Sequence, residues 1–345
     1  MGIRRLNVVV VIAVFIGLMV LSGCAVSQKE KTIGRSIVDM AGTSVALPEK
    51  VNRVAATGAV NQIVLMLGGA DKIVATATNV QENELFAKVY PHIKEIPAPF
   101  GVMDAGRSEV NVETLVATKP DVVFGNNDKI RAMGIPTVET SLKNPEEIKQ
   151  TIMLIGKVLG PEEEKRAIQF CTYYDDNMKK VSERTKTIAA NKKVKVYYAN
   201  NKPTNTDGMN SIANSWIEMA GGINVAGEAG VDGVGKNVSG EDLVRWNPDV
   251  IIVSNSSVKN AILQNDQWGN INAVKNKRIY VNPKGVYLWS VRSAEGALQF
   301  IWAAKIIQPE LFADINLKEQ VRNFYKMFYF YDVNDAEIER ILDPD

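Results

Sequence analysis

The sequence has few of the residues on which metal centres and many catalytic sites depend. Its 345 residues include one histidine, His92, and two cysteines, Cys24 and Cys171. A single histidine excludes a multi-histidine metal centre, and two cysteines cannot form a disulfide framework. These counts disfavour histidine-based catalysis, and we expect no resident cofactor, no metal site and no catalytic residue.

Charge and hydropathy exclude further classes of protein. The 40 Lys and Arg residues nearly balance the 39 Asp and Glu residues, and no sustained basic run points to nucleic acid. The longest apolar run, residues 8–21, has 14 residues, whereas a membrane-spanning helix needs about 20. The composition is that of a globular protein, and the length favours about two domains of roughly 150 residues.

The N-terminus has the pattern of an export signal. An arginine pair at positions 4 and 5 precedes the apolar run, which ends in Leu21-Ser22-Gly23-Cys24. We interpret residues 1–23 as a signal peptide. The ending resembles the lipobox of bacterial lipoproteins, which implies cleavage before Cys24 and lipidation of that residue. Residues 24–35 would then form a polar, lipid-anchored tether. The alternative is a short anchor helix with an incidental cysteine.

The remaining chain contains an internal repeat. The segment from Glu113 to Val123 (ETLVATKPDVV) matches the one from Glu241 to Ile251 (EDLVRWNPDVI), and each predicts a short helix, a Pro-Asp break and a buried strand. A second pair, MLGGAD from Met66 and MAGGIN from Met219, predicts a helix that ends in a glycine cap. Two ordered pairs of motifs indicate two related α/β lobes.

Short apolar strands alternate with helical segments, a pattern typical of parallel sheets covered on both faces. Between the halves, a helical pattern begins at Gly160-Pro161 and continues towards Ala190. We predict two Rossmann-like lobes with parallel sheets, joined by one long helix. The expected strands lie at 51–57, 73–77, 121–124, 194–199, 249–253 and 278–281. The expected domains are an N-terminal lobe (36–160), the connecting helix (161–191) and a C-terminal lobe (192–345).

Together these features resemble class III substrate-binding proteins of ABC importers, the family that serves iron-siderophores, haem, cobalamin and some oxyanions. The segment from Asp39 to Val54 resembles the family's opening hairpin, and Ile306 to Phe312 resembles its late helix and break. The resemblance covers roughly residues 36–345. It implies a monomer that delivers a small ligand to a permease dimer.

The resemblance also suggests a role for the glutamates that begin the repeat. Glu113 and Glu241 would each lie in the first turn of a helix, after Asn111 and Ser239, which suit the N-cap position. The family implies that this pair, one from each lobe, docks onto arginines of the permease. The alternative is that each only stabilises its helix dipole.

The ligand of such a protein should lie at the carboxyl ends of the strands. The loop after the last strand carries Tyr287, Trp289 and Arg292, which suit an anionic, planar or chelated ligand. Alternatively, Trp289 is buried and Arg292 pairs with Glu295. Further candidates for ligand contact on neighbouring loops are Arg107, which could instead pair with Asp104 or Glu109, and the turn residues Asn126 and Asn201.

Within this family, an iron(III)-siderophore-like complex is the favoured ligand. Cobalamin, haem and an oxyanion such as molybdate are the alternatives. An extracytoplasmic metal-dependent enzyme on a similar frame is the alternative of another class, although the sequence shows no cluster of ligands for it. Two features are interpreted as structural: Cys171 as a packed apolar residue, and the aromatic group from Phe324 to Tyr331 as core. His92 is interpreted as a surface residue.

Overall fold

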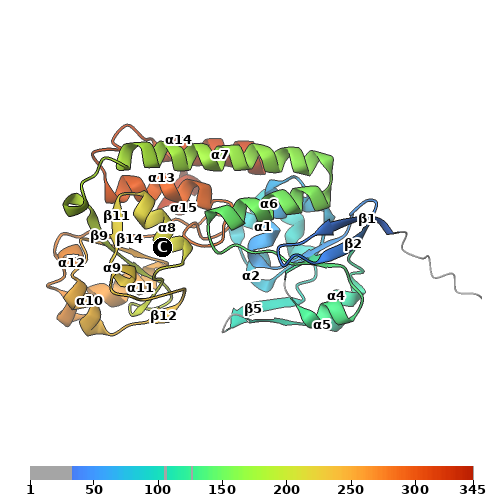
Figure 1. The fold of residues 1–345 in the computed structure, drawn as a ribbon, viewed down its shortest axis with the longest axis horizontal. Coiled ribbons are helices and arrows are strands. Elements are labelled where there is room, and N and C mark those ends of the chain that lie inside the picture. The colour runs from blue at the N-terminus through green and yellow to red at the C-terminus, as the bar shows by residue number, and fades with distance from the viewer. Residues whose placement is uncertain (1–32, 105–106, 126, 345) are drawn as a thin grey trace, which may run out of the picture. The chain divides into compact units, whose positions relative to one another are not determined.

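An antiparallel hairpin begins the part of the chain that the computed structural model describes, which is residues 33–104, 107–125 and 127–344. Strand β1 (Ile33–Val38) pairs with β2 (Ser44–Pro48), as the family resemblance implies (Figure 1). Gly42 has φ +79° in the turn between the strands, a conformation that glycine adopts without steric cost.

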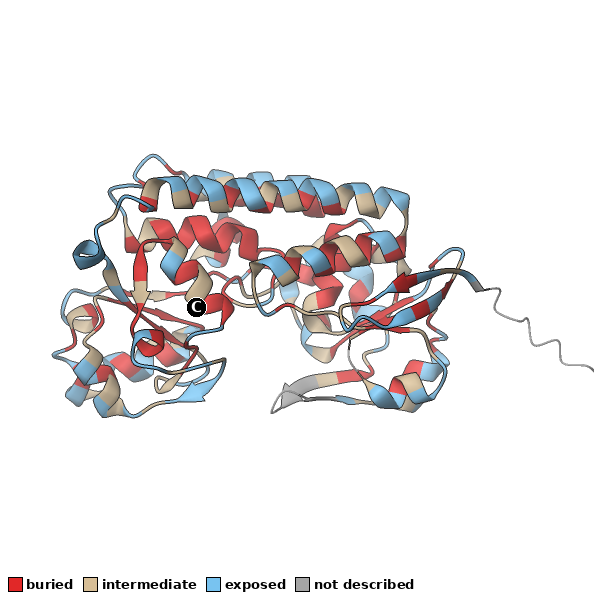
Figure 2. Ribbon diagram, in the orientation of Figure 1, coloured by how far each residue is buried: buried red, intermediate tan, exposed pale blue. Residues whose placement is uncertain are grey.

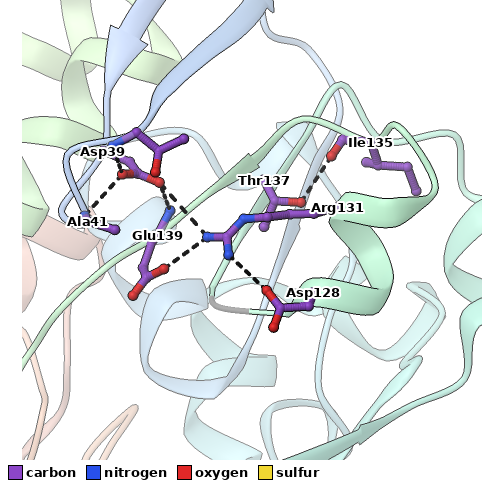
Figure 3. A network of polar contacts seen from close by, with 8 residues as sticks. Asp39, Ala41, Asp128, Arg131, Ile135, Thr137 and Glu139 are labelled. Atoms are coloured by element: carbon purple, nitrogen blue, oxygen red, sulfur yellow. Dashed lines mark hydrogen bonds and ion pairs between the residues drawn. The ribbon is translucent and has the colours of Figure 1, made fainter.

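The buried carboxylate of Asp39 fixes this hairpin to the first lobe (Figure 3). It accepts hydrogen bonds from the backbone N–H groups of Ala41 (3.0 Å), Thr43 (2.8 Å) and Glu139 (3.1 Å). The Arg131 guanidinium lies 2.9 Å from the carboxylate of Glu139, which raises the pKa of Arg131. The turn is thereby joined to the edge of the sheet beside it.

The first sheet has the strand order β4-β3-β7-β8, and all its neighbouring strands are parallel. Its strands are β3 (Val54–Ala56), β4 (Ile73–Ala75), β7 (Val122–Phe124) and β8 (Thr137–Val138). A separate hairpin, β5 (Phe100–Asp104) with β6 (Arg107–Val110), also belongs to this lobe. The helices are α1 (Gly58–Met66), α2 (Thr78–Gln81), α3 (Glu84–Val89), α4 (Val112–Ala117), α5 (Asp128–Ala132) and α6 (Pro145–Leu159).

The second sheet repeats this order as β11-β9-β13-β14, again parallel, and adds a short antiparallel pair, β10 and β12, at one edge. Its strands are β9 (Val194–Ala199), β10 (Asn205–Thr206), β11 (Gly222–Asn224), β12 (Lys236–Asn237), β13 (Val250–Val253) and β14 (Ile279–Val281). The helices between and after them are α8 (Ile212–Met219), α9 (Val225–Glu228), α10 (Gly240–Trp246), α11 (Ser256–Leu263), α12 (Asn272–Lys275) and α13 (Gly296–Ile307).

One long helix, α7 (Pro161–Thr185), connects the lobes (Figure 1) and is hydrogen-bonded to both. The Arg166 guanidinium donates to the carbonyl of Met66 (2.8 Å), in the first lobe. In the second lobe, Thr185 Oγ1 donates to the carbonyl of Met219 (2.7 Å). The predicted fold class, two α/β lobes with parallel sheets joined by a long helix, is confirmed. The helix ends at Thr185, earlier than the predicted 161–191, and the domain boundaries stay a prediction.

The C-terminal aromatic group packs in the core beneath α7. Phe324, Tyr325, Phe328 and Tyr329 are buried, at the end of α14 (Leu317–Phe324) and in the π-helical turn that follows, before α15 (Asp335–Leu342). Two of these rings contact Phe170 of α7. The interpretation as core is confirmed for these four residues and is wrong for Phe330, which is 69% exposed. Figure 2 shows a similar concentration of buried residues along α13.

The thiol beside this core is unreactive by its environment. Cys171 on α7 is partly buried, and burial raises its pKa to about 11. It is therefore protonated at neutral pH and packs as a small apolar side chain, as predicted.

The Pro-Asp motif of the repeat performs the same task in both lobes. The Asp121 carboxylate accepts the backbone N–H of Arg53 (3.0 Å), just before β3. The Asp249 carboxylate accepts the backbone N–H of Lys195 (3.2 Å), at the start of β9. Each aspartate thus joins the amino ends of two neighbouring strands.

The backbone conformations of the repeat also match. Gly68 and Gly221 follow α1 and α8 with φ +83° and +78°, the left-handed cap that the glycine pairs predict. The residues before the two prolines, Lys119 and Asn247, both have φ +46°. The repeat in the sequence therefore corresponds to a repeat in the backbone.

Candidate ligand-binding site

The first lobe places a helix N-terminus at the carboxyl end of its sheet. Strand β3 ends at Ala56, and α1 begins at Gly58 with Thr57 as an N-cap that makes no side-chain capping bond. The N–H groups of Val60 and Asn61 donate to the Thr57 carbonyl. Those of Gly58 and Ala59 have no acceptor among the described residues. Unpaired N–H groups and the helix dipole together favour an anion at such a position.

The second lobe places one candidate residue, Tyr287, next to this helix start. A Cβ added to Gly58 would lie 3.3 Å from the Tyr287 hydroxyl oxygen, so this half-buried tyrosine reaches from one lobe to the other. Arg292 on the same loop is exposed, and it makes no hydrogen bond or ion pair with any residue that the structure describes. Burial raises the pKa of Tyr287, and the nearby positive charge of Arg292 opposes this shift.

The charge of Arg292 also acts on a buried carboxylate, that of Asp207. Asp207, 1% exposed, accepts hydrogen bonds from the N–H of Gly235 (2.8 Å) and from the Asn200 amide (3.3 Å). Burial raises the pKa of Asp207, whereas these two bonds and the charge of Arg292 lower it. The guanidinium therefore lies in the field of Asp207 while its donors stay available.

Trp289, unlike Arg292, is buried. Its side chain is 1% exposed, and its indole N–H has no partner in the described part of the chain. Burial is the alternative that the sequence left open, and ligand contact by Trp289 stays a prediction. The other alternative, a pair between Arg292 and Glu295, is wrong. The Glu295 carboxylate instead accepts the backbone N–H groups of Val286 and Tyr287 and the hydroxyl of Tyr325.

The remaining candidates lie on other loops. Arg107 begins β6, opposite Asp104 in the β5–β6 ladder, and its side chain lies outside the described part of the structure, as does the whole of Asn126. Asn201 is exposed in the turn between β9 and β10. The structure therefore brings Arg292 within electrostatic reach of Tyr287, and ligand contact by Arg107, Asn126 and Asn201 stays a prediction.

The two glutamates of the repeat occupy equivalent positions. Asn111 caps α4 through the N–H of Thr114, and Ser239 caps α10 through the N–H of Asp242. Glu113 and Glu241 are thus both the second residue of their helices. Both are exposed, and neither forms an ion pair with a described residue.

Each of these glutamates has an apolar neighbour one helical turn later. Val116 and Val244, three residues after Glu113 and Glu241, are both 43% exposed. Residues three apart lie on the same face of a helix. Each lobe therefore presents the same pair, a carboxylate and a valine.

A cavity of about 490 Å³ lies at the opposite, amino end of the first sheet, beside His92. The imidazole is 71% exposed, in agreement with its interpretation as a surface residue. The Arg53 guanidinium at this cavity already donates to the carbonyls of Thr118 and Lys119. Within the described ranges, no three His, Cys, Asp or Glu side chains gather as metal ligands, and no helix is long and apolar enough to cross a membrane.

Within the loops expected to line the site, the sequence did not single out Gly58 or Asp207, and it offered Glu295 only as a partner of Arg292. Gly58 had a usable signal, because a small residue follows a buried strand and begins a helix. Asp207 and Glu295 had none, since their burial depends on contacts with residues distant in the sequence.

Comparison with known proteins agrees with this architecture. The family described as "Periplasmic binding protein" matches residues 54–285. The chain is 30% identical to the molybdate-binding protein MolA of Haemophilus influenzae, over 86% of this chain and 91% of that protein. It is 25% identical to the uncharacterized ABC transporter substrate-binding lipoprotein YvrC of Bacillus subtilis, over 88% of this chain and 97% of YvrC.

Solved structures show the same relationship. The molybdate complex of MolA superimposes with a TM-score of 0.77 at 29% identity, covering 87% of this chain and 99% of MolA. A periplasmic solute-binding protein from Veillonella parvula gives 0.77 at 30% identity, covering 89% of this chain and 96% of that one. The chain therefore belongs to the periplasmic binding protein family, as a class III substrate-binding protein of an ABC importer.

Proposed function

We propose that this substrate-binding protein captures a small oxyanion of the molybdate class between its lobes and delivers it to an ABC permease. One observation carries the proposal: the Tyr287 hydroxyl lies beside Gly58, the first residue of α1, whose N–H has no acceptor among the described residues, and Arg292, on the same loop, has no ion pair with a described residue. A hydroxyl, a guanidinium and a helix N-terminus are all donors suited to oxyanion oxygens.

The burial of Trp289 supports a small ligand over a large planar one. A haem or corrin ring needs exposed apolar or aromatic surface on which to lie, and Trp289 is 1% exposed. MolA, the relative with 30% identity, binds molybdate by its name. The iron-siderophore complex, which the sequence favoured, stays a prediction and is tested in the same experiment.

The anchor and the docking contacts are part of the same proposal. Cys24 would carry the lipid, and YvrC, named a lipoprotein, supports this assignment. Glu113 and Glu241 would contact arginines of the permease dimer. Their identical helix positions support the idea, because a symmetric dimer presents the same socket twice. No part of the proposal requires chemistry on the ligand.

Isothermal titration calorimetry tests the ligand. The full chain in detergent is titrated with molybdate and tungstate, with sulfate as a competitor, and separately with a ferric siderophore, haem and cobalamin. We expect saturable binding of molybdate or tungstate. Binding of only a ferric siderophore, haem or cobalamin would contradict the oxyanion proposal.

Substitution of Arg292 locates the site. Arg292→Ala removes charge-assisted hydrogen bonds, so the Kd for molybdate should rise by about tenfold to a hundredfold. Arg322→Ala is the matched control, because this guanidinium is on α14 and is paired with Asp335. Equal affinity of the wild type and Arg292→Ala would place the ligand elsewhere.

A further inference from the structure

A buried carboxylate that the proposed site does not itself use lies directly behind Tyr287. Glu295 is 0% exposed and immediately precedes α13. One of its oxygens accepts the N–H of Tyr287 (2.8 Å), and the other accepts the N–H of Val286 (3.2 Å) and the hydroxyl of Tyr325. The N-terminus of a helix is a favourable place for a negative charge.

The backbone approaches this carboxylate so closely that only glycine fits at the start of the loop. A Cβ added to Gly285 would lie 2.1 Å from the Tyr325 hydroxyl oxygen and 2.2 Å from Glu295 Oε1. Neither atom can move freely, because both belong to the same buried set of hydrogen bonds. The absence of a side chain at position 285 is therefore a condition for the contact between Glu295 and the loop.

The other lobe holds the same loop from the opposite side. The Asn83 amide nitrogen donates to the carbonyls of Gly285 (3.3 Å) and Val286 (3.0 Å). Its Oδ1 accepts the N–H of Phe86 (2.7 Å) and so caps α3. The loop is thus fixed by its N–H groups to the second lobe and by its carbonyls to the first.

The π-helical turn provides a second connection between the lobes. Tyr329, one turn after Tyr325, donates its hydroxyl hydrogen to Gln62 Oε1 on α1 (3.3 Å). The Ser293 hydroxyl donates to the same oxygen (3.3 Å). One short segment, Tyr325–Tyr329, therefore contacts both Glu295 and the helix whose N-terminus faces Tyr287.

From these contacts we infer that Glu295 is a positioning residue, which holds the backbone of Val286 and Tyr287 so that the Tyr287 hydroxyl stays at the start of α1. The inference rests on the proposed function for its consequence: the loop is set in place before an anion arrives. A preformed site avoids the entropy cost of ordering the loop on binding. Glu295 does not touch the ligand.

Hydrogen exchange in the ligand-free protein tests the positioning alone. Glu295→Gln keeps the shape of the side chain but leaves one oxygen acceptor for two N–H groups. We expect the amides of Val286 and Tyr287 to exchange about tenfold faster or more in this variant. Glu310→Gln, at an exposed glutamate, is the matched control. Unchanged exchange at both amides would overturn the inference.

A double-mutant cycle then tests the consequence for binding. In the wild type, Tyr287→Phe should raise the Kd for molybdate by about tenfold. In the Glu295→Gln background the same change should have little further effect, because Tyr287 is already displaced. Independent, additive losses would show that Glu295 acts on stability alone and would overturn the inference.

The two measurements separate this inference from the proposed ligand. If the wild type fails to bind molybdate, the oxyanion proposal is wrong, and the exchange rates still decide whether Glu295 positions the loop. If Glu295→Gln does not fold, Tyr325→Phe replaces it in both experiments. That variant removes the donor to Glu295 Oε1 and also the hydroxyl oxygen that accepts the N–H of Val286 (3.2 Å). The amide of Tyr287, which bonds Glu295, therefore reports on the carboxylate and should exchange faster. Unchanged exchange there would likewise overturn the inference.

Discussion

The two lobes are alike at the amino ends of their sheets and different at the carboxyl ends. At the amino ends, Asp121 and Asp249 accept equivalent backbone N–H groups, and Glu113 and Glu241 begin equivalent helices. At the carboxyl ends, the first lobe offers the backbone of α1, whereas the second offers Tyr287 and Arg292. The equivalent surfaces at the amino ends suit a symmetric partner that has the same binding surface twice. The different groups at the two carboxyl ends suit a ligand that makes different contacts with each lobe.

Among these predictions, removal of both glutamates of the repeat should have the largest effect, a loss of ligand uptake. The pair Glu113→Ala and Glu241→Ala should abolish ligand uptake into cells while the Kd measured by calorimetry stays nearly constant, because neither carboxylate lies at the carboxyl edge of its sheet. A control pair, Glu95→Ala and Glu310→Ala, removes the same charge from other exposed positions. Equal loss of uptake and affinity would point to misfolding and contradict the docking role.

The valines beside these glutamates make the comparison sharper. If docking uses the whole repeated surface, Val116→Ala and Val244→Ala should each weaken uptake partially and to a similar degree. Unequal effects would show that the permease does not use the two lobes equally.

The buried Glu295 should make the stability depend on pH. Burial raises the pKa of Glu295 from 4.5 to about 7, so the folded protein binds a proton more tightly than the unfolded chain. The corresponding stabilisation is complete below pH 4.5 and is lost as the pH rises through 7. A shift of this size corresponds to roughly 3 kcal/mol of unfolding free energy.

Urea unfolding at several pH values measures this contribution. The difference in unfolding free energy between the wild type and Glu295→Gln should fall between about pH 5 and pH 7.5, since glutamine does not titrate there. A constant difference across that range would show that Glu295 titrates alike in both states.

The glycine caps should give the smallest effects and the most direct comparison between lobes. Gly68→Ala forces a left-handed alanine at a place with room for a Cβ and should cost about 1 kcal/mol. At Gly221, the Cβ would also lie 2.6 Å from Ile188 Cδ1. Gly221→Ala should therefore lower the free energy of unfolding by more than Gly68→Ala, as thermal or urea unfolding would show. Equal losses would mean that Ile188 moves freely.

Most of the frame could be predicted from the sequence because its signals are local. Apolar runs predict the strands β3, β4, β7, β9, β13 and β14, the repeat predicts two lobes, and Gly160-Pro161 predicts where the connecting helix begins. The antiparallel pair β10 and β12 has no such signal, because each strand has only two residues and its partner lies about thirty residues away in the sequence.

The candidate site was harder to predict, for a physical reason. Tyr287, Trp289 and Arg292 are close in sequence, but only the fold determines that Trp289 points into the core while Arg292 points to solvent. The sequence offered a pair between Arg292 and Glu295 as an alternative, whereas the side-chain partner of Glu295 is Tyr325, thirty residues away. Nearness in sequence predicted the loop and failed to predict its contacts.

The long helix has a mechanical consequence. Helix α7 has 25 residues, a length of about 37 Å, and it is bonded near its start to the first lobe and near its end to the second. A helix bonded to both lobes in this way resists large changes in their separation, so the lobes should move only slightly when a ligand binds. Small-angle scattering should then detect little change in the radius of gyration. Ligand release would then require the permease to supply the energy that separates the two lobes against the stiffness of α7.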